Sequence, residues 1–151
     1  MGTALELIAD LEQVNIKETA LVVMKANAKE FTMLNQAQML EGKGKTKNIG
    51  KYSGSPLGRK YSKMKKSMNP LAGEGNVDLR LTGSYYRGMR MEMKGDDIEM
   101  DSSDSKADDL LAKYGGNIYG LNEKNMPIFT EVAFMPDLQA VITDKTGLKF
   151  S

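Results

Sequence analysis

The sequence predicts an α+β fold in which a long N-terminal helix packs on a small antiparallel β-sheet. Three features support this prediction. The stretch from Ile16 to Leu40 has no glycine or proline and spaces its apolar residues like one face of a helix. Apolar and charged residues alternate between Met89 and Asp101, as in strands with one covered face. A glycine-rich segment at about 42–76 separates these regions, and short helices are predicted near the C-terminus. The 151 residues suffice for a single domain, 1–151, with its own core.

Two helix starts are marked by capping residues. Thr3 and Glu6 match the pattern in which each side chain bonds the backbone N–H of the other residue. Asn15 and Glu18 offer a second cap directly before the long apolar-periodic stretch.

The second helix is predicted to be unusually long. A continuous helix from Ile16 to Leu40 would extend roughly 37 Å at about 1.5 Å per residue, which exceeds the diameter of a small domain. Part of it would then pack on something besides its own sheet. The alternative is a helix that breaks near Asn27 or Asn35.

The segment at about 42–76 is predicted to form a long basic arm. Gly42 ends the helix, and the many glycines and prolines that follow leave room for a helix only from Arg59 to Ser67. A loop of about thirty residues is unusual as a passive connection, so we expect the arm to be functional and to be ordered by a partner. Its cations are Lys43, Lys45, Lys47, Lys51, Arg59, Lys60, Lys63, Lys65 and Lys66.

A β-hairpin is predicted at about 87–102. Methionines and Ile98 alternate with charged residues on both sides of the sequence Lys94-Gly95-Asp96-Asp97, which is typical of a tight turn. We expect the apolar face of the hairpin to lie on the long helix.

The region after the hairpin predicts a short helix from Ser105 to Tyr114. Ser105 would cap it, with Asp108 three residues later, and Gly115 would close it. The stretch from Asn117 to Leu121 is then a turn or a short strand.

A last helical region is predicted to begin at Asn122. Pro127 suits a first helical turn, whereas Pro136 must break or restart the helix. This leaves a terminal helix from Asp137 to Asp144. The β-branched residues between Ile128 and Val132 make a short strand the alternative.

The composition argues against an enzyme. The chain contains no His, Cys or Trp, so the commonest general base, the thiolate nucleophile and the zinc ligands His and Cys are missing. We expect no catalysis, no cofactor and no metal. No apolar run reaches the roughly 18 residues that a membrane span needs, and the first residues lack the features of a signal peptide.

Charge is segregated along the chain although its formal net charge is only +1. The stretch from Lys43 to Gly73 carries nine cations and no acid, whereas the stretch from Glu92 to Asp109 carries eight acids and two lysines. Such segregation concerns partners more than fold. We favour docking of the arm on an acidic surface of a neighbouring subunit or partner. The candidate acidic residues are Asp96, Asp97, Glu99, Asp101, Asp104, Asp108 and Asp109.

Two other interpretations of the arm remain open. It is either a solvated loop or a nucleic-acid contact in which Tyr52 and Tyr61 stack on bases. The Gly-Lys-Gly-Lys-Thr sequence at 42–46 is not a phosphate-binding loop, because Met39 stands where the motif needs its first glycine. The acids from Asp101 to Asp109 lack the spacing of a calcium-binding loop.

The stretch from Val77 to Met89 contains Leu81-Thr82-Gly83 and resembles the Leu-x-x-Thr-Gly-x-Leu-x-x-Ser-Ile signature of tailed-phage virion-morphogenesis and tail-completion proteins of the Mu-like group and its relatives. The order of the surrounding parts is also similar. A helix, a polar Gly/Lys-rich stretch, the Thr-Gly signature and a hairpin follow one another from Glu18 to Leu121. The chain departs from the family where Tyr85 and Tyr86 replace Leu-Arg.

The resemblance implies an α+β structural subunit of a virion. Such a subunit joins a homo-oligomeric ring at the head–tail junction as a neck, tail-completion or terminator protein, without catalysis. The implied partners are further copies of the chain, neighbouring head–tail junction or tail proteins, and DNA passing through the lumen, but no membrane. The implied location is the virion, and the bacterial host cytoplasm during assembly. Thr82 and Gly83 would set the turn into the hairpin. The alternative is a small nucleic-acid-binding protein that uses residues 43–66.

Overall fold

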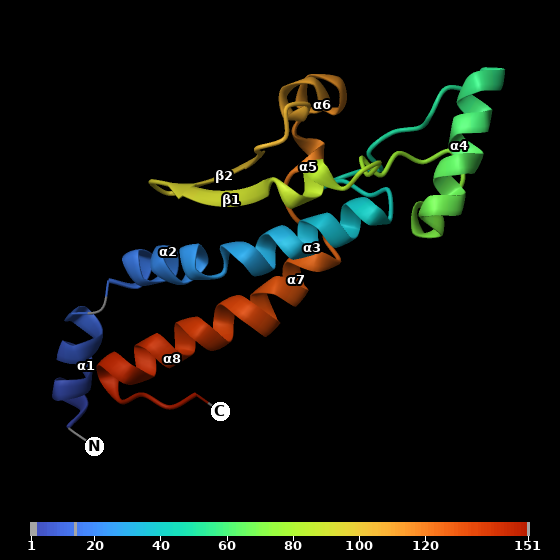
Figure 1. Cartoon of the computed structure of the whole chain (residues 1–151). Helices are drawn as coiled ribbons and strands as arrows, with labels where there is room; N and C mark the ends of the chain where they lie inside the picture. Colours follow the sequence, from blue (N-terminus) through green and yellow to red (C-terminus); the bar gives the residue numbers. More distant parts are fainter. Residues whose placement is uncertain (1–2, 14, 151) are drawn as a thin grey trace.

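The computed structural model describes residues 3–13 and 15–150 and has the mixed α+β fold that the sequence predicts. The hairpin lies on one side of the α2–α3 pair, and the C-terminal helices lie on the other side (Figure 1). The molecule is elongated, with α1 at one end and α4 at the other (Figure 1). Its elements are α1 Ala4–Gln13, α2 Ile16–Ala26, α3 Ala28–Leu40, α4 Pro56–Met68, η1 Pro70–Ala72, α5 Ser84–Arg87, β1 Met89–Lys94, β2 Asp97–Ser102, α6 Ala107–Tyr114, η2 Gly116–Ile118, α7 Asn125–Phe129, η3 Thr130–Phe134 and α8 Met135–Thr146.

Both predicted N-terminal caps are confirmed. The backbone N–H of Thr3 donates to Glu6 Oε2 at 2.6 Å, and that of Glu6 donates to Thr3 Oγ1 at 3.2 Å. The N–H of Glu18 donates to Asn15 Oδ1 at 3.0 Å. Capping of this kind satisfies backbone donors that have no partner within the helix.

The long helix is broken at Asn27, as the alternative prediction stated. Asn27 is buried and separates α2 from α3. Its Nδ2 donates to the carbonyl oxygen of Val23 at 2.9 Å and to Asp137 Oδ2 at 2.8 Å. This side chain therefore joins the helix break to the first turn of α8, a contact that local sequence signals do not reveal.

The hairpin has the predicted two-residue turn and alternation. β1 and β2 pair antiparallel from Met89 opposite Ser102 to Lys94 opposite Asp97. Gly95 adopts a φ of +60°, which the tight turn requires and a glycine tolerates. Met89 and Met91 are buried against α3, whereas Ile98 near the turn is 45% exposed. The helices thus cover the base of the apolar face but not its tip.

The chain is helical from Asn125 to Thr146, so the alternative strand between Ile128 and Val132 is wrong. Asn122 caps α7 as predicted, because its Oδ1 accepts from the backbone N–H of Asn125 at 3.0 Å. Pro136 lies in the first turn of α8, but the backbone is helical from Asn125 through Thr146. The predicted break at Pro136 is therefore wrong, and α8 extends beyond the predicted stretch from Asp137 to Asp144 at both ends. The π-helical segment η3 joins α7 to α8, and such a turn relieves the clash of a proline ring with the preceding backbone.

The predicted cap of α6 is wrong. The helix begins at Ala107, and Ser105 does not cap it. Asp104 Oδ1 accepts from the backbone N–H of Lys106 at 2.9 Å instead. Gly115, with a φ of +73°, closes the helix as predicted, and residues 116–118 form a 3₁₀ turn where a turn or strand was expected.

Two apolar clusters lie on either side of a buried polar network. One cluster contains Tyr85, Tyr86 and Ile118, and the other contains Phe31 and Phe129, whose rings meet edge to face at 5.2 Å. The network between α3 and the segment before α7 is centred on two side chains that are almost fully buried, Asn35 and Gln38. It holds the C-terminal helices, which form the third layer of the fold after the hairpin and the α2–α3 pair, against α3. No helix in the described part of the chain is long and apolar enough to span a bilayer.

Candidate functional site

The predicted basic arm consists of two separate parts, a turn and a helix. The turn closes through a β-bridge between Lys43 and Asn48. The backbone N–H of Lys45 donates to the carbonyl oxygen of Asn117 at 2.7 Å, and the Asn117 amide donates to the carbonyl oxygen of Lys47 at 3.0 Å. Lys43, Lys45, Lys47 and Lys51 are all exposed around this turn. It is therefore an ordered basic surface, although a long mobile loop was expected.

The second part of the arm is the helix α4, which is longer than the predicted stretch from Arg59 to Ser67. It begins at Pro56, and Ser55 caps it by accepting from the backbone N–H of Gly58 at 3.1 Å. Its exposed cations are Arg59, Lys60, Lys63 and Lys66. This helix projects at one end of the molecule (Figure 1), so its basic face is open to a partner.

Lys65 was predicted to contact a partner, and this prediction is wrong because the side chain is buried. Its side chain is 4% exposed, and its Nζ lies 2.8 Å from Asp78 Oδ1 and donates to the carbonyl oxygen of Arg80. Asp78 also accepts from the Asn69 amide at 2.8 Å and from the Arg80 backbone N–H at 3.0 Å. This buried ion pair fastens α4 to the body of the molecule, and it is a structural group.

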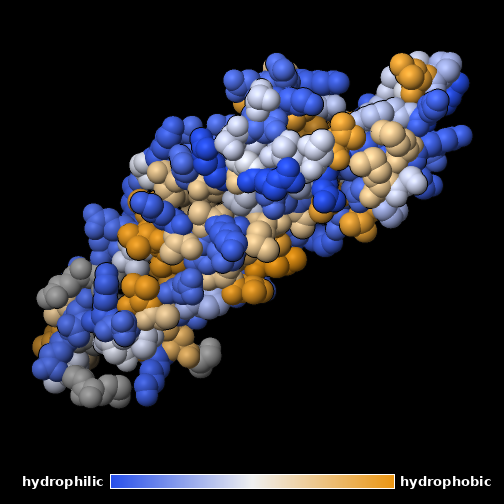
Figure 2. Space-filling view, viewed as in Figure 1, coloured by the Kyte–Doolittle hydropathy of each residue, from blue (hydrophilic) through white to orange (hydrophobic). Residues whose placement is uncertain are grey.

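An apolar stripe runs along α4 beside its basic face. Leu57, Tyr61, Met64 and Met68 follow one another at spacings of four, three and four residues, which places them on one side of a helix. They are 78%, 36%, 44% and 51% exposed. Figure 2 shows hydrophobic atoms at the surface of this end of the molecule. A helix that combines exposed apolar and basic residues in this way is suited to docking.

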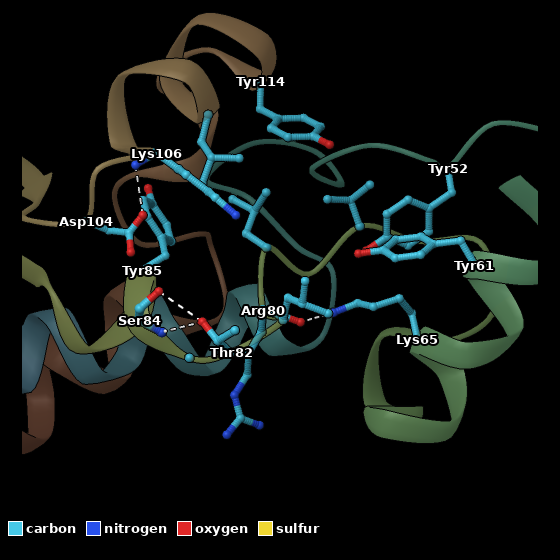
Figure 3. A pocket seen from close by; sticks show the side chains of 15 residues that line it. Tyr52, Tyr61, Lys65, Arg80, Thr82, Ser84, Tyr85, Asp104, Lys106 and Tyr114 are labelled. Atoms are coloured by element: carbon cyan, nitrogen blue, oxygen red, sulfur yellow. Dashed lines mark hydrogen bonds between the residues drawn. The ribbon is translucent and has the colours of Figure 1, made fainter.

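A cavity of about 200 Å³ lies between α4 and α6 (Figure 3). Tyr52, Tyr61 and Tyr114 line it, and the rings of Tyr52 and Tyr61 meet edge to face at 5.1 Å. These two rings pack on each other, which leaves less area for stacking on bases than we expected from the sequence. Leu79 lines the cavity with a φ of +58°, a strained conformation for this residue.

The cavity is lined by hydroxyl groups and apolar surface. Within residues 3–13 and 15–150, no three acidic side chains converge on a point that would hold a metal ion. The arrangement can accept a side chain of a partner, with tyrosine hydroxyls and Lys106 as hydrogen-bonding groups at its rim.

Burial raises the pKa of Tyr52, Tyr85 and Tyr86 above the ordinary value of 10.0. In the unfolded chain these phenols ionise near that value, so folding opposes their ionisation. The stability is therefore retained below about pH 10 and is lost as the pH rises above it. We expect a lower midpoint of denaturant unfolding at about pH 11 than at about pH 8. A Tyr85→Phe variant should lose less stability between these two pH values than the unchanged protein. An equal loss in both proteins would contradict the raised pKa of Tyr85 as a source of the effect.

The acidic segment also consists of two parts, the hairpin and the first turn of α6. In the hairpin, Lys17 pairs with Asp96 at 2.6 Å, and neighbouring strand residues pair with the others, Lys94 with Glu99 at 2.9 Å and Arg90 with Asp101 at 3.9 Å. Asp97, Asp108 and Asp109 are exposed. The Ser84 hydroxyl and the Lys106 backbone N–H hold the pKa of Asp104 below its usual range.

No ion pair in the described part of the chain joins the basic arm to the acidic segment. The arm pairs instead with nearby acids, Lys43 with Glu41, Lys65 with Asp78 and Lys66 with Glu74. The two charged surfaces therefore do not neutralise each other within one molecule.

Thr82 and Gly83 form a turn, as predicted, but a short helix separates it from the hairpin. Gly83 has a φ of +84° and precedes α5. The hydroxyls of Thr82 and Ser84 lie 3.0 Å apart and stabilise the turn.

Comparison with known proteins gives no assignment: no family model, no curated protein and no solved structure matches this chain.

Proposed function

We propose that this protein is a structural subunit of a tailed-phage virion. It forms a homo-oligomeric ring at the head–tail junction, as a neck, tail-completion or terminator protein, and performs no catalysis. The Thr-Gly signature and the order of elements around it support the virion assignment. The observation that carries the assembly role is the exposed basic and apolar face of α4. Of its exposed cations, Lys66 pairs with Glu74, whereas Arg59, Lys60 and Lys63 have no ion pair in the described part of the chain.

The shape of the molecule suits a ring. In a ring, one surface of each subunit meets a different surface of the next. The elongated body carries α4 at one end and a different set of elements at the other (Figure 1). Ends of unlike structure favour such head-to-tail contacts over pairing of identical surfaces.

The assembly role predicts a defined oligomer that depends on the cations of α4. The triple variant Lys60→Glu, Lys63→Glu, Lys66→Glu should be monomeric in light scattering at a concentration where the unchanged protein assembles. A matched control reverses three exposed lysines elsewhere, Lys25, Lys29 and Lys145. It should assemble normally. About 1 M salt, at which the Debye length is roughly 3 Å, should weaken the assembly.

The virion assignment is tested separately. Purified particles of the phage that encodes this chain should contain it in a fixed number of copies at the junction of head and tail. A particle reconstruction that places it elsewhere, or particles that lack it, would overturn this assignment.

Nucleic-acid binding is the second candidate, and the exposed cations of α4 favour it. Arg59 and Lys66 span about 10 Å along the helix at about 1.5 Å per residue, a length that matches several phosphates of one strand. This function predicts a monomer that retards DNA, with the retardation lost in the α4 triple variant. An oligomer that forms without DNA supports the ring.

A further inference from the structure

The apolar stripe of α4 lies between two other faces of the same helix. Ser62, Lys65 and Asn69, at the helix end, are buried against the body. Lys60 and Lys63 lie on the opposite side of the stripe and are exposed. A partner helix laid along this stripe would cover apolar side chains and would at the same time meet a row of cations.

The helix α1 has the complementary properties. It carries Glu6, Asp10 and Glu12 and no cation. Leu5 and Ile8, three residues apart and so on one side of the helix, are 78% and 51% exposed. It is an acidic helix with exposed apolar residues, whereas α4 is a basic helix with exposed apolar residues.

The two helices lie at opposite ends of the molecule (Figure 1), so α1 lies far from α4 of its own chain. It can reach α4 of another copy. A contact between opposite ends of identical subunits repeats around a ring, because every subunit retains one unused surface until the ring closes.

We propose that α1 of one copy packs along the apolar stripe of α4 of the next copy. Leu5 and Ile8 cover the stripe between Leu57 and Met68. Glu12, which the helix places between Leu5 and Ile8, faces the exposed lysines of α4. This inference rests on the proposed ring and names the two surfaces that form it.

The acidic hairpin is a weaker counterpart than the sequence indicated. Asp96, Glu99 and Asp101 already have cationic partners within the molecule. The three acids of α1 have no ion pair in the described part of the chain, and Glu12 lies on the same side of the helix as the exposed Leu5 and Ile8. For this reason α1 replaces the hairpin in the contact that we propose.

Cysteine cross-linking tests the contact, because the chain has no cysteine of its own. One protein carries Ile8→Cys and a second carries Met64→Cys, and the two are mixed under mild oxidation. A disulfide requires Cα atoms roughly 4.4–6.8 Å apart. We expect a cross-linked heterodimer to form about tenfold faster than in the control mixture of Val132→Cys with Met64→Cys, because docking raises the effective concentration. Val132 is a matched control, since it is 73% exposed.

Charge exchange provides an independent result. Asp10→Lys with Glu12→Lys should abolish assembly, and so should the α4 triple variant. Mixing the two variants should restore a heterodimeric contact, because the lysines of one then face the glutamates of the other. As a control, a variant with Asp97, Asp108 and Asp109 changed to lysine is mixed with the α4 triple variant. This mixture should not restore the contact.

The outcomes separate the contact from the ring. A defined oligomer of the unchanged protein, together with equal cross-linking in the test and control mixtures, would overturn the α1–α4 contact and leave the ring intact. An unchanged protein that stays monomeric at every concentration would overturn both.

Discussion

Replacement of Lys65 by methionine is expected to lower the free energy of unfolding by about 3–5 kcal/mol. The substitution leaves Asp78 charged in the interior without its cation, and breaking one side of a buried pair has this cost. Asp78 is 1% exposed, so water cannot replace the lysine. Two neutral donors, the Asn69 amide and the Arg80 backbone N–H, remain beside the carboxylate but carry no compensating charge.

The same substitution should detach α4 from the body. Lys65 is the only cation of α4 that is buried among the described residues, and it holds the helix to the segment from Asp78 to Arg80. Urea unfolding followed by circular dichroism gives the loss of stability. Limited proteolysis should show faster cleavage around residues 53–69 than in the unchanged protein.

Two further variants make the result decisive. Lys63→Met removes an exposed lysine from the same helix and should change the stability by less than about 0.5 kcal/mol. The double variant Lys65→Met with Asp78→Asn removes the unpaired charge and should recover part of the loss. If Lys65→Met is as mild as Lys63→Met, the buried pair does not form in solution.

Local signals predicted the elements whose stability is local. The caps at Thr3 and Asn15 and the turn at Gly95 depend on neighbouring residues alone, so the sequence suffices to place them. The length of α4 was underestimated because Gly58 was interpreted as a helix breaker. Gly58 lies in the first turn of α4, where a Cβ atom would clash with the carbonyl oxygen of Ser53. That requirement is visible only in three dimensions.

The candidate site was predicted only in part, because the sequence does not show which side of α4 faces inward. Nine cations formed one group in the sequence, yet the fold buries Lys65 and separates the turn around Lys45 from the helix. One signal could have marked Lys65: it shares a helix face with Ser62 and Asn69, and these polar residues face the body with it. The acids of α1 were not considered as a partner surface, because the dense run of acids from Glu92 to Asp109 was interpreted as the acidic counterpart of the arm.

The second large effect is expected for Gln38→Met, which should lower the free energy of unfolding by about 3 kcal/mol. Gln38 is 1% exposed and satisfies three groups. Its Nε2 donates to the carbonyl oxygen of Gly120 at 2.6 Å, and its Oε1 accepts from the Asn122 backbone N–H at 3.0 Å and from the Asn125 amide at 3.2 Å. Methionine has a similar volume and helix propensity but leaves these groups unpaired, at a cost of about 1–3 kcal/mol for each that stays buried.

The matched control for Gln38→Met is Gln139→Met in α8, where the half-buried side chain has no hydrogen bond in the described part of the chain and the change should stay within about 0.5 kcal/mol. Hydrogen exchange provides a local result, because the Asn122 amide loses its acceptor and should exchange faster in Gln38→Met alone. Since this amide precedes α7, its release would loosen the C-terminal helices from α3 while the hairpin on the opposite side keeps its contacts. Equal stability of the two variants, with unchanged exchange at Asn122, would mean that apolar packing alone holds the third layer in place.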